Sequence, residues 1–305
     1  MGIYLAAYAA LGVFLIVVIA RVVRITSLPV HLRWELYPVA HEENAAHGGS
    51  FFERVDWWKH PRKHSLLGTL KVMVPEILFL KGVYEHNRSL WVRSYPFHLG
   101  LYLLAGFLGL LVVGGLLQTT GEQLSPAQGF GALIYWLTIV FGAAGLVLAL
   151  IGALALLLRR LGDPALRCHS SAADFFNLVF FLVTAAVALL AFVVVDGDFA
   201  HLRGFVQQLA TFDTTASLPP LVTVEVLLAA ALLAYIPATH MSHFFTKWFM
   251  YHDVRWDDRV NEVGSELEGQ IKVQLAYQVS WSASHINGGG KKTWVDVATE
   301  EVSKQ

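Results

Sequence analysis

The sequence has 305 residues, of which 55% are hydrophobic and 15% are charged, with a formal net charge of -1 and a mean hydropathy of +0.53. A soluble domain carries about 25% charged residues, so this composition is typical of an integral membrane protein and gives no indication of a nucleic-acid partner. The single cysteine, Cys168, excludes an intrachain disulfide framework, a thiolate-ligated iron–sulfur cluster and a covalent haem site. A redox centre in this chain would therefore need imidazole ligands, and the sequence has thirteen histidines.

Five apolar segments are long enough to cross a bilayer core of about 30 Å, which takes roughly 20 helical residues. They cover residues 3–23, 96–117, 129–158, 175–195 and 221–251. The first segment is interpreted as a retained helix, because it lacks the basic start of a signal peptide and no small-residue cleavage site precedes Arg21. The sequence thus predicts an all-α integral membrane protein, with a five-transmembrane-helix bundle over residues 1–252 and a cytoplasmic docking tail at 253–305.

The basic residues are concentrated on one side of this topology. The loop 24–95, the link before residue 175 and the tail are rich in Lys and Arg, whereas the link between the second and third segments has none and the next external link has only Arg203. The positive-inside rule therefore predicts an external N-terminus, a long cytoplasmic loop at 24–95 and a cytoplasmic C-terminus. Within that loop, residues 66–81 form an amphipathic stretch around Pro75, for which we expect a helix at the membrane interface.

Three histidines fall inside the predicted spans, where such side chains are costly and usually functional. His98 lies near the cytoplasmic start of the second span, and His240 and His243 lie near the cytoplasmic end of the fifth. Because these spans run antiparallel, His98 and His243 are expected at similar depth, as the two axial imidazoles of one b-type haem require. His240 shares a helix face with His243, so it is expected to contact a propionate, to line a proton route, or to be the ligand in its place. The alternatives are hydrogen bonds between helices, a proton path or a zinc site.

Glu225 is the other ionisable side chain whose burial inside a predicted span costs free energy. It precedes His243 by eighteen positions, which is five turns of a continuous helix, so the two are expected on one face at opposite membrane surfaces. We interpret Glu225 as a proton acceptor in quinone chemistry, with a water-exposed interfacial carboxylate as the alternative. Four weaker candidates remain. Arg93 and Lys247 lie at a depth suited to haem propionates, and His201 is an external loop residue that could approach a quinone headgroup. His169 lies at the cytoplasmic start of the fourth span, with a solvated loop histidine as the alternative.

The helical part, roughly residues 95–250, resembles the cytochrome b (gamma) subunit of respiratory nitrate reductase. The stretch 237–246, PATHMSHFFT, is similar to that family's closing haem motif, and the basic link with Ser170, Ser171 and Asp174 is also similar. The resemblance implies a haem b subunit of a quinone-linked oxidoreductase. That family holds two haems, and its outer ligands would fall on Leu108 and Glu225. Because leucine cannot ligate iron, one haem is expected, and two only if the outer one is ligated differently.

Two stretches of the first loop resemble a narrower group. Residues 31–42, HLRWELYPVAHE, and 74–82, VPEILFLKG, are similar to the cytochrome b subunits of transmembrane redox complexes of sulfate-reducing bacteria, which are related to the membrane subunits of heterodisulfide reductase and of the dissimilatory sulfite reductase-linked complex. This likeness implies a bacterial inner membrane, menaquinone and a cytoplasmic iron–sulfur subunit of heterodisulfide-reductase type. Some of these complexes also have an external multihaem cytochrome c.

The resulting hypothesis is a membrane subunit that passes electrons between menaquinone and an iron–sulfur subunit. One rival is a transporter or channel, which would show internal repeats, broken helices and ionisable groups at the membrane midplane. The other is a structural membrane anchor, which leaves the three histidines inside the spans unexplained.

Overall fold

The computed structural model describes residues 1–27, 55–56, 59–61, 66–122, 124–127, 129–215, 217–249, 261–279, 282–283, 286–287 and 290–300. The chain divides into two compact units. The first unit holds residues 1–17 and 73–239, and the second holds residues 18–72 and 240–305. The stretch 31–42 lies outside the described residues.

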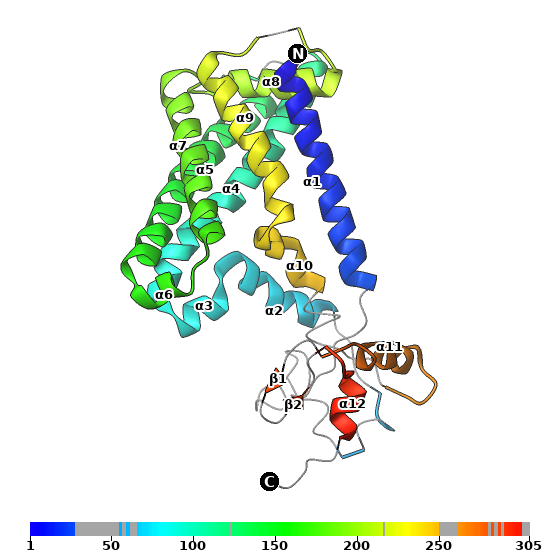
Figure 1. Ribbon diagram of the computed structural model, residues 1–305. Coiled ribbons are helices and arrows are strands. Elements are labelled where there is room, and N and C mark those ends of the chain that lie inside the picture. Colours follow the sequence, from blue (N-terminus) through cyan, green and yellow to red (C-terminus); the bar gives the residue numbers. More distant parts are fainter. Residues whose placement is uncertain are drawn as a thin grey trace. The chain divides into compact units, whose positions relative to one another are not determined.

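Among the described residues, five helices are long and apolar enough to cross a membrane, as the sequence predicts. They are α1 (Gly2–Ser27), α4 (Arg88–Thr119), α5 (Gly129–Gly162), α7 (Ala172–Val194) and α9 (Pro220–Tyr235), the last extended to Ala238 by the 3-10 turn η4 (Ile236–Ala238). In the first unit, α5 packs between α4 and α7, and α9 packs on α7 (Figure 1). The short helix α8 (Ala200–Thr211) packs on α4 at one end of this bundle.

The helix α4 begins eight residues earlier than the predicted start at Pro96. The side chain of Asn87 accepts a hydrogen bond from the Leu90 backbone N–H and so caps the helix, and Pro96 lies inside it. The predicted segment covers only the apolar residues that can cross the bilayer core, whereas the helix extends upstream to Arg88, where the asparagine N-cap satisfies a free N–H group. His98 therefore lies almost three turns inside α4 rather than near its start.

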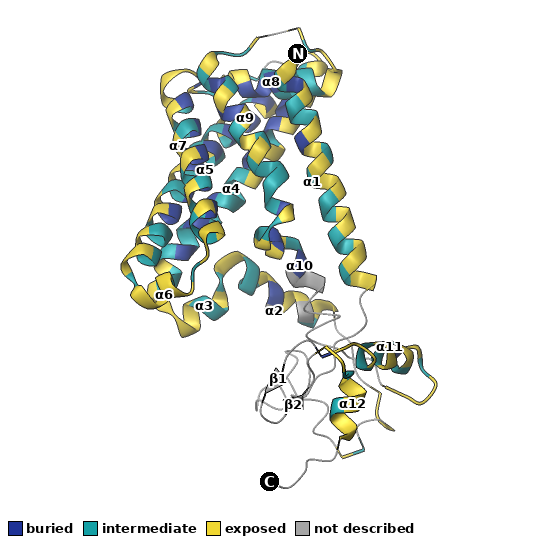
Figure 2. Cartoon of the chain, viewed as in Figure 1, coloured by how far each residue is buried: buried dark blue, intermediate teal, exposed yellow. Residues whose placement is uncertain are grey.

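Small residues allow α4 and α5 to approach closely. A Cβ atom built on Gly152 would lie 2.3 Å from the backbone nitrogen of Phe97, and one built on Gly100 would lie 2.4 Å from the backbone nitrogen of Ala149. Helices in a membrane associate through such close packing, since lipid supplies little hydrophobic drive between them. Figure 2 shows that buried residues line the interior between the helices and the region beneath α8, whereas the outward faces of the helices are exposed.

We expect Gly152→Ala to destabilise the protein by about 1–3 kcal/mol, because the added methyl group meets the backbone of α4 and the helices must separate. Gly12→Ala in α1 is the matched control, since a Cβ there has no described atom within 4 Å and alanine favours a helix over glycine by about 1 kcal/mol. The midpoint of thermal unfolding in detergent should fall for the first variant and should not fall for the second. Equal midpoints would contradict the packing described here.

The fifth span is not the continuous helix over 221–251 that the sequence predicts. After α9 the chain forms η4, an extended residue at Thr239 and a second 3-10 turn, η5 (His240–Ser242), before α10 (His243–Phe249) begins. Pro237 explains the break, because it has no N–H to donate and its ring clashes with the carbonyl of the preceding turn. The five-turn count behind the expectation that Glu225 and His243 share one helix face requires an unbroken helix, so it does not apply here, and the two residues belong to different units.

Shorter helices lie at the end of the bundle opposite α8. They are α2 (Leu66–Phe79), α3 (Lys81–His86) and α6 (Pro164–Cys168) (Figure 1). The helix expected over 66–81 is thus present as α2, and it continues through Pro75 without a break. Tyr102 of α4 donates a hydrogen bond of 2.5 Å to the Ile77 carbonyl, which fixes the C-terminal half of α2 against α4.

The second unit contains the end of α1, the turn η5, α10 and short elements of the tail. In it, Arg21 Nη1 donates a 2.7 Å hydrogen bond to Ser242 Oγ, next to the candidate histidines. The tail forms α11 (Glu266–Leu275), a two-stranded antiparallel sheet of β1 (Ser282–Ala283) and β2 (Ile286–Asn287), and α12 (Trp294–Thr299). Its described buried apolar residues are Leu267 and Val279.

Candidate functional site

His98 is held in one orientation by its own helix. Its Nδ1 atom lies 2.8 Å from the Ser94 carbonyl oxygen and 3.3 Å from Ser94 Oγ, one turn earlier in α4. A carbonyl oxygen can only accept, so the ring proton is on Nδ1 and the lone pair is on Nε2. This arrangement, in which the far nitrogen of a histidine donates to a backbone carbonyl, is the usual way proteins orient an imidazole that ligates a metal.

The face of α4 beyond His98 carries two small, exposed residues and, one turn after His98, the ring of Tyr102, whose centre lies 6.5 Å from that of His98. Ala105 and Gly109 lie within about 20° of His98 around the helix, and both are exposed. A Cβ built on Gly109 would meet no described atom within 4 Å. A planar macrocycle would therefore meet no bulky side chain at Ala105 and Gly109 and would lie beside the Tyr102 ring, and the orientation of His98 fits one axial ligand of a haem.

His240 and His243 belong to the second unit, whereas His98 belongs to the first. Both are exposed, and His243 Nδ1 lies 3.3 Å from the His240 carbonyl oxygen. In a 3-10 turn, side chains three residues apart are nearly eclipsed, so the two rings remain on one side of this segment. The choice between His240 and His243 as ligand thus stays open, and their pairing with His98 stays a proposal.

The four weaker candidates lie on α4, α6, α8 and α10, and none is shown in contact with His98. Arg93 Nη1 donates to the carbonyl and the hydroxyl of Ser89, both at 2.6 Å, and it lies about 140° around α4 from His98, so the two do not share a face. His169 is exposed at the end of α6 with Nδ1 2.8 Å from the Ala165 carbonyl. His201 is exposed in the first turn of α8. Lys247 lies in α10.

Buried charged residues gather at the other end of the first unit. Glu225 of α9 is 6% exposed and Asp196 is 2% exposed, and the two carboxyl groups are close enough to interact electrostatically. Asp196 precedes α8 and accepts hydrogen bonds from the backbone N–H groups of His201, at 2.9 Å, and Leu202, at 3.2 Å. Asp196 therefore stabilises the positive end of the α8 dipole.

Arg203 of α8 completes this buried group at 2% exposure. Its Nη1 donates a 2.7 Å hydrogen bond to the Asp198 carbonyl, and its Nη2 lies 3.8 Å from Asp198 Oδ2. Its guanidinium carbon lies 5.4 Å from the centre of the Tyr135 ring, and no described atom pairs with its Nε. Burial lowers the pKa of Arg203, and the carboxylates of Asp198 and Asp196 oppose that shift. A buried guanidinium is costly unless it is paired, which explains why carboxylates surround it.

Sequence reasoning missed Asp196 and the burial of Arg203, because both lie in a link that was interpreted as an external loop. The usable signal was a lone arginine following two aspartates in a segment that otherwise has no basic residue. Leu108, where the resemblance would place an outer haem ligand, is 54% exposed on α4.

The family model for the nitrate reductase gamma subunit matches residues 82–257, which include every candidate residue named above. No curated protein sequence matches the chain. The matched region covers more than half of the sequence and contains α4, α5, α7 and α9 with their histidines and buried charges. The chain therefore belongs to the nitrate reductase gamma subunit family, whose members are haem b membrane subunits of quinol-linked oxidoreductases.

Proposed function

We propose that the chain is the haem b subunit of a respiratory complex in a bacterial inner membrane, and that it passes electrons between menaquinone and a cytoplasmic iron–sulfur subunit of heterodisulfide-reductase type. The observation that carries the proposal is His98, an imidazole inside a membrane span whose Nδ1 proton is held by a backbone carbonyl. The family membership supplies the cofactor class and the quinol link.

His98 and His243 are the proposed axial ligands, with His240 as the alternative to His243. Haem b, when bound, supplies one-electron transfer, and its potential depends on the axial ligands and the dielectric of the surround. The protein orients His98 through Ser94 and keeps the neighbouring face of α4 small at Ala105 and Gly109. One haem is proposed, because Leu108 cannot act as an outer ligand.

Glu225 is the proposed proton acceptor at the opposite end. Quinol oxidation releases protons. Placing a carboxylate inside the membrane costs free energy, and such residues usually have a function, for example in proton transfer. The buried neighbour Asp196 supports this role, because it provides a second carboxyl group that can relay a proton between Glu225 and the end of the bundle at α8.

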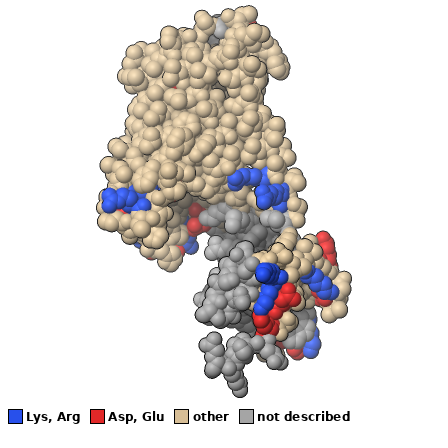
Figure 3. Space-filling model, in the orientation of Figure 1, with Lys and Arg blue, Asp and Glu red and all other residues tan. Residues whose placement is uncertain are grey.

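The orientation follows from the basic residues of the first unit. Six lie at the end that carries α3 and α6, and Arg203 lies at the end that carries α8; the six are Lys81, Arg88, Arg93, Arg159, Arg160 and Arg167. On the face shown in Figure 3, most of the helical bundle carries no charge and basic side chains appear near the α6 end. By the positive-inside rule this end is cytoplasmic, which places the N-terminus, α8 and any external multihaem cytochrome c on the other side.

The haem-to-protein ratio of the purified chain, by pyridine haemochrome assay, tests this function. A ratio near one is the expected result. A ratio near two would show an outer haem with other ligands, for which His169, His201 and His240 are the residues to replace. A chain without haem would contradict the electron-transfer role and leave a membrane anchor or a transporter.

A further inference from the structure

One face of α4 carries aromatic side chains on both sides of His98. Trp91 lies about two turns before His98 and Tyr102 about one turn after it, and both lie within about 40° of His98 around the helix. The ring centre of Tyr102 is 6.5 Å from that of His98. A segment that these two aromatic residues hold in place therefore lies on the side of α4 that carries the proposed haem ligand.

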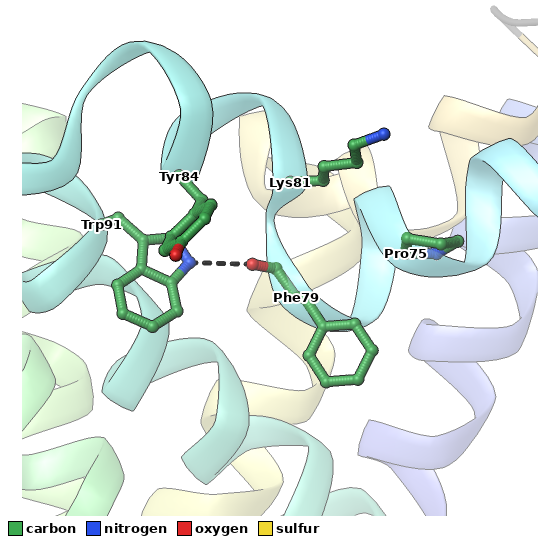
Figure 4. A pocket seen from close by; sticks show the side chains of 5 residues that line it. All are labelled: Pro75, Phe79, Lys81, Tyr84 and Trp91. Carbon is green, nitrogen blue, oxygen red and sulfur yellow. Dashed lines mark hydrogen bonds between the residues drawn. The ribbon is translucent and has the colours of Figure 1, made fainter.

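The segment that they hold is the C-terminal end of α2. The Tyr102 hydroxyl donates a 2.5 Å hydrogen bond to the Ile77 carbonyl, and Trp91 Nε1 donates one of 2.8 Å to the Phe79 carbonyl (Figure 4). The last four carbonyl groups of a helix have no N–H partner within it, so side chains of α4 satisfy two of those of α2. Tyr102 and the residues of α2 from Met73 onward belong to the same compact unit.

The turn that follows α2 is fixed as well. Leu80 adopts a left-handed conformation with φ of 52°, which is unfavourable for a residue with a side chain. The Gly82 N–H donates to Glu76 Oε2 at 2.7 Å across this turn. The Tyr84 ring packs edge-on against that of Trp91 with centres 5.1 Å apart, and both rings line a small apolar pocket (Figure 4). Because such a turn persists only when its surroundings determine it, the place of α2 beside α4 is a defined feature of the fold.

The two sides of α2 differ in burial. Met73 is 2% exposed and Ile77, one turn later, is half-buried, whereas Val74 and Leu78 are exposed on another face of the helix. The hydrogen bond from Tyr102 goes to Ile77, so the end of this buried apolar stripe lies against the His98 face of α4. Apolar residues around a metal site control the access of solvent to it.

We propose that Tyr102 is a positioning residue for the haem site, which holds the end of α2 across the His98 face of α4 and so limits the access of water to the haem. The inference rests on the proposed role of His98 as a haem ligand. Burial and solvent exposure contribute to the potential of a haem. Ferric haem with two neutral imidazoles carries one more positive charge than ferrous haem, and water stabilises that charge. Release of α2 should therefore lower the midpoint potential.

Hydrogen exchange of the full, haem-loaded chain in nanodiscs measures how firmly α2 is held. Tyr102→Phe keeps the ring and removes only the hydroxyl that donates to Ile77. Backbone N–H groups between Met73 and Gly82 should exchange about fivefold faster in this variant, as expected when local opening loses the opposition of one hydrogen bond of average strength. Peptides from α5 should exchange as they do in the natural chain.

The haem supplies the second readout. Tyr102→Phe should keep the haem content of the natural chain, because His98 and its contact with the Ser94 carbonyl are unchanged. Its midpoint potential, measured by redox titration followed by optical absorbance, should be lower than that of the natural chain. A purely structural role at the end of α2 would leave the potential unchanged, so this readout separates positioning of the haem surround from stability.

Tyr95→Phe is the matched control. The Tyr95 ring stacks on that of Trp91 with centres 4.7 Å apart, and its hydroxyl makes no hydrogen bond to α2 among the described residues. Its exchange and its potential should equal those of the natural chain. Unchanged exchange in Tyr102→Phe, faster exchange with an unchanged potential, or equal shifts in the two variants would overturn the proposal. A natural chain without haem would instead contradict the proposed function, so the two failures are distinguishable.

Discussion

His98→Ala should yield a folded membrane protein without haem b. His98 is the candidate ligand that belongs to the long, regular helix α4, and its Nδ1 contact with the Ser94 carbonyl holds the ring in the form that ligates iron. Alanine removes that ligand, and no other described histidine of the first unit lies inside a membrane span. The haem-to-protein ratio should fall from about one to background in the pyridine haemochrome assay.

The fold should survive this change, because alanine is a better helix former than histidine and His98 is only half-buried. Far-ultraviolet circular dichroism checks that point, and added imidazole should restore part of the haem binding by filling the vacated ligand position. His86→Ala is the control, since His86 is exposed at the end of α3 and should leave the haem content unchanged. A His98→Ala protein with full haem content would refute the ligand assignment.

Glu225→Gln should slow quinol-dependent reduction of the bound haem by about 10²–10⁴-fold, the usual contribution of a general base. Glutamine keeps the shape of the side chain and can still form hydrogen bonds, but it cannot accept a proton. Glu225 is buried beside Asp196, so water cannot easily take over its role. Stopped-flow spectroscopy with a menaquinol analogue measures the rate, and the haem content should be that of the natural chain.

Glu225→Asp should retain part of the rate, because it keeps a carboxylate at a shifted position. Glu122→Gln is the control, since Glu122 is exposed just after the end of α4 and is expected to have no part in the reaction. If Glu225→Gln reduced the haem as fast as the natural chain does, Glu225 would be a structural carboxylate, and the proton acceptor would have to be sought elsewhere.

The sequence could predict the features that depend on the bilayer and on local periodicity. A bilayer imposes a minimum length of apolar helix, so the five spans are readable without a structure, and α5 and α7 begin and end within a few residues of the expected positions. The cost of burying an imidazole in lipid likewise singles out His98, and the motif 237–246 carries the family resemblance that the family model confirms.

The structure was needed for two kinds of feature: helix ends at which two local signals compete, and the burial of charged residues from distant segments. Asn87 rather than Pro96 caps the start of α4, and the chain leaves the α-helix after Tyr235 at Pro237, so the turn count that linked Glu225 to His243 has no continuous helix. The burial of Asp196 and Arg203 also required the structure, because α8 must fold against α4 before a residue of an external link can become buried. The sequence by itself thus determined which segments cross the membrane and which imidazole to suspect, through the energetics of transfer into lipid. The structure was needed to show which local signal, the Asn87 cap or the prolines, sets each helix end, and the packing of helices decided which charged groups meet, because that outcome depends on contacts between residues far apart in the chain.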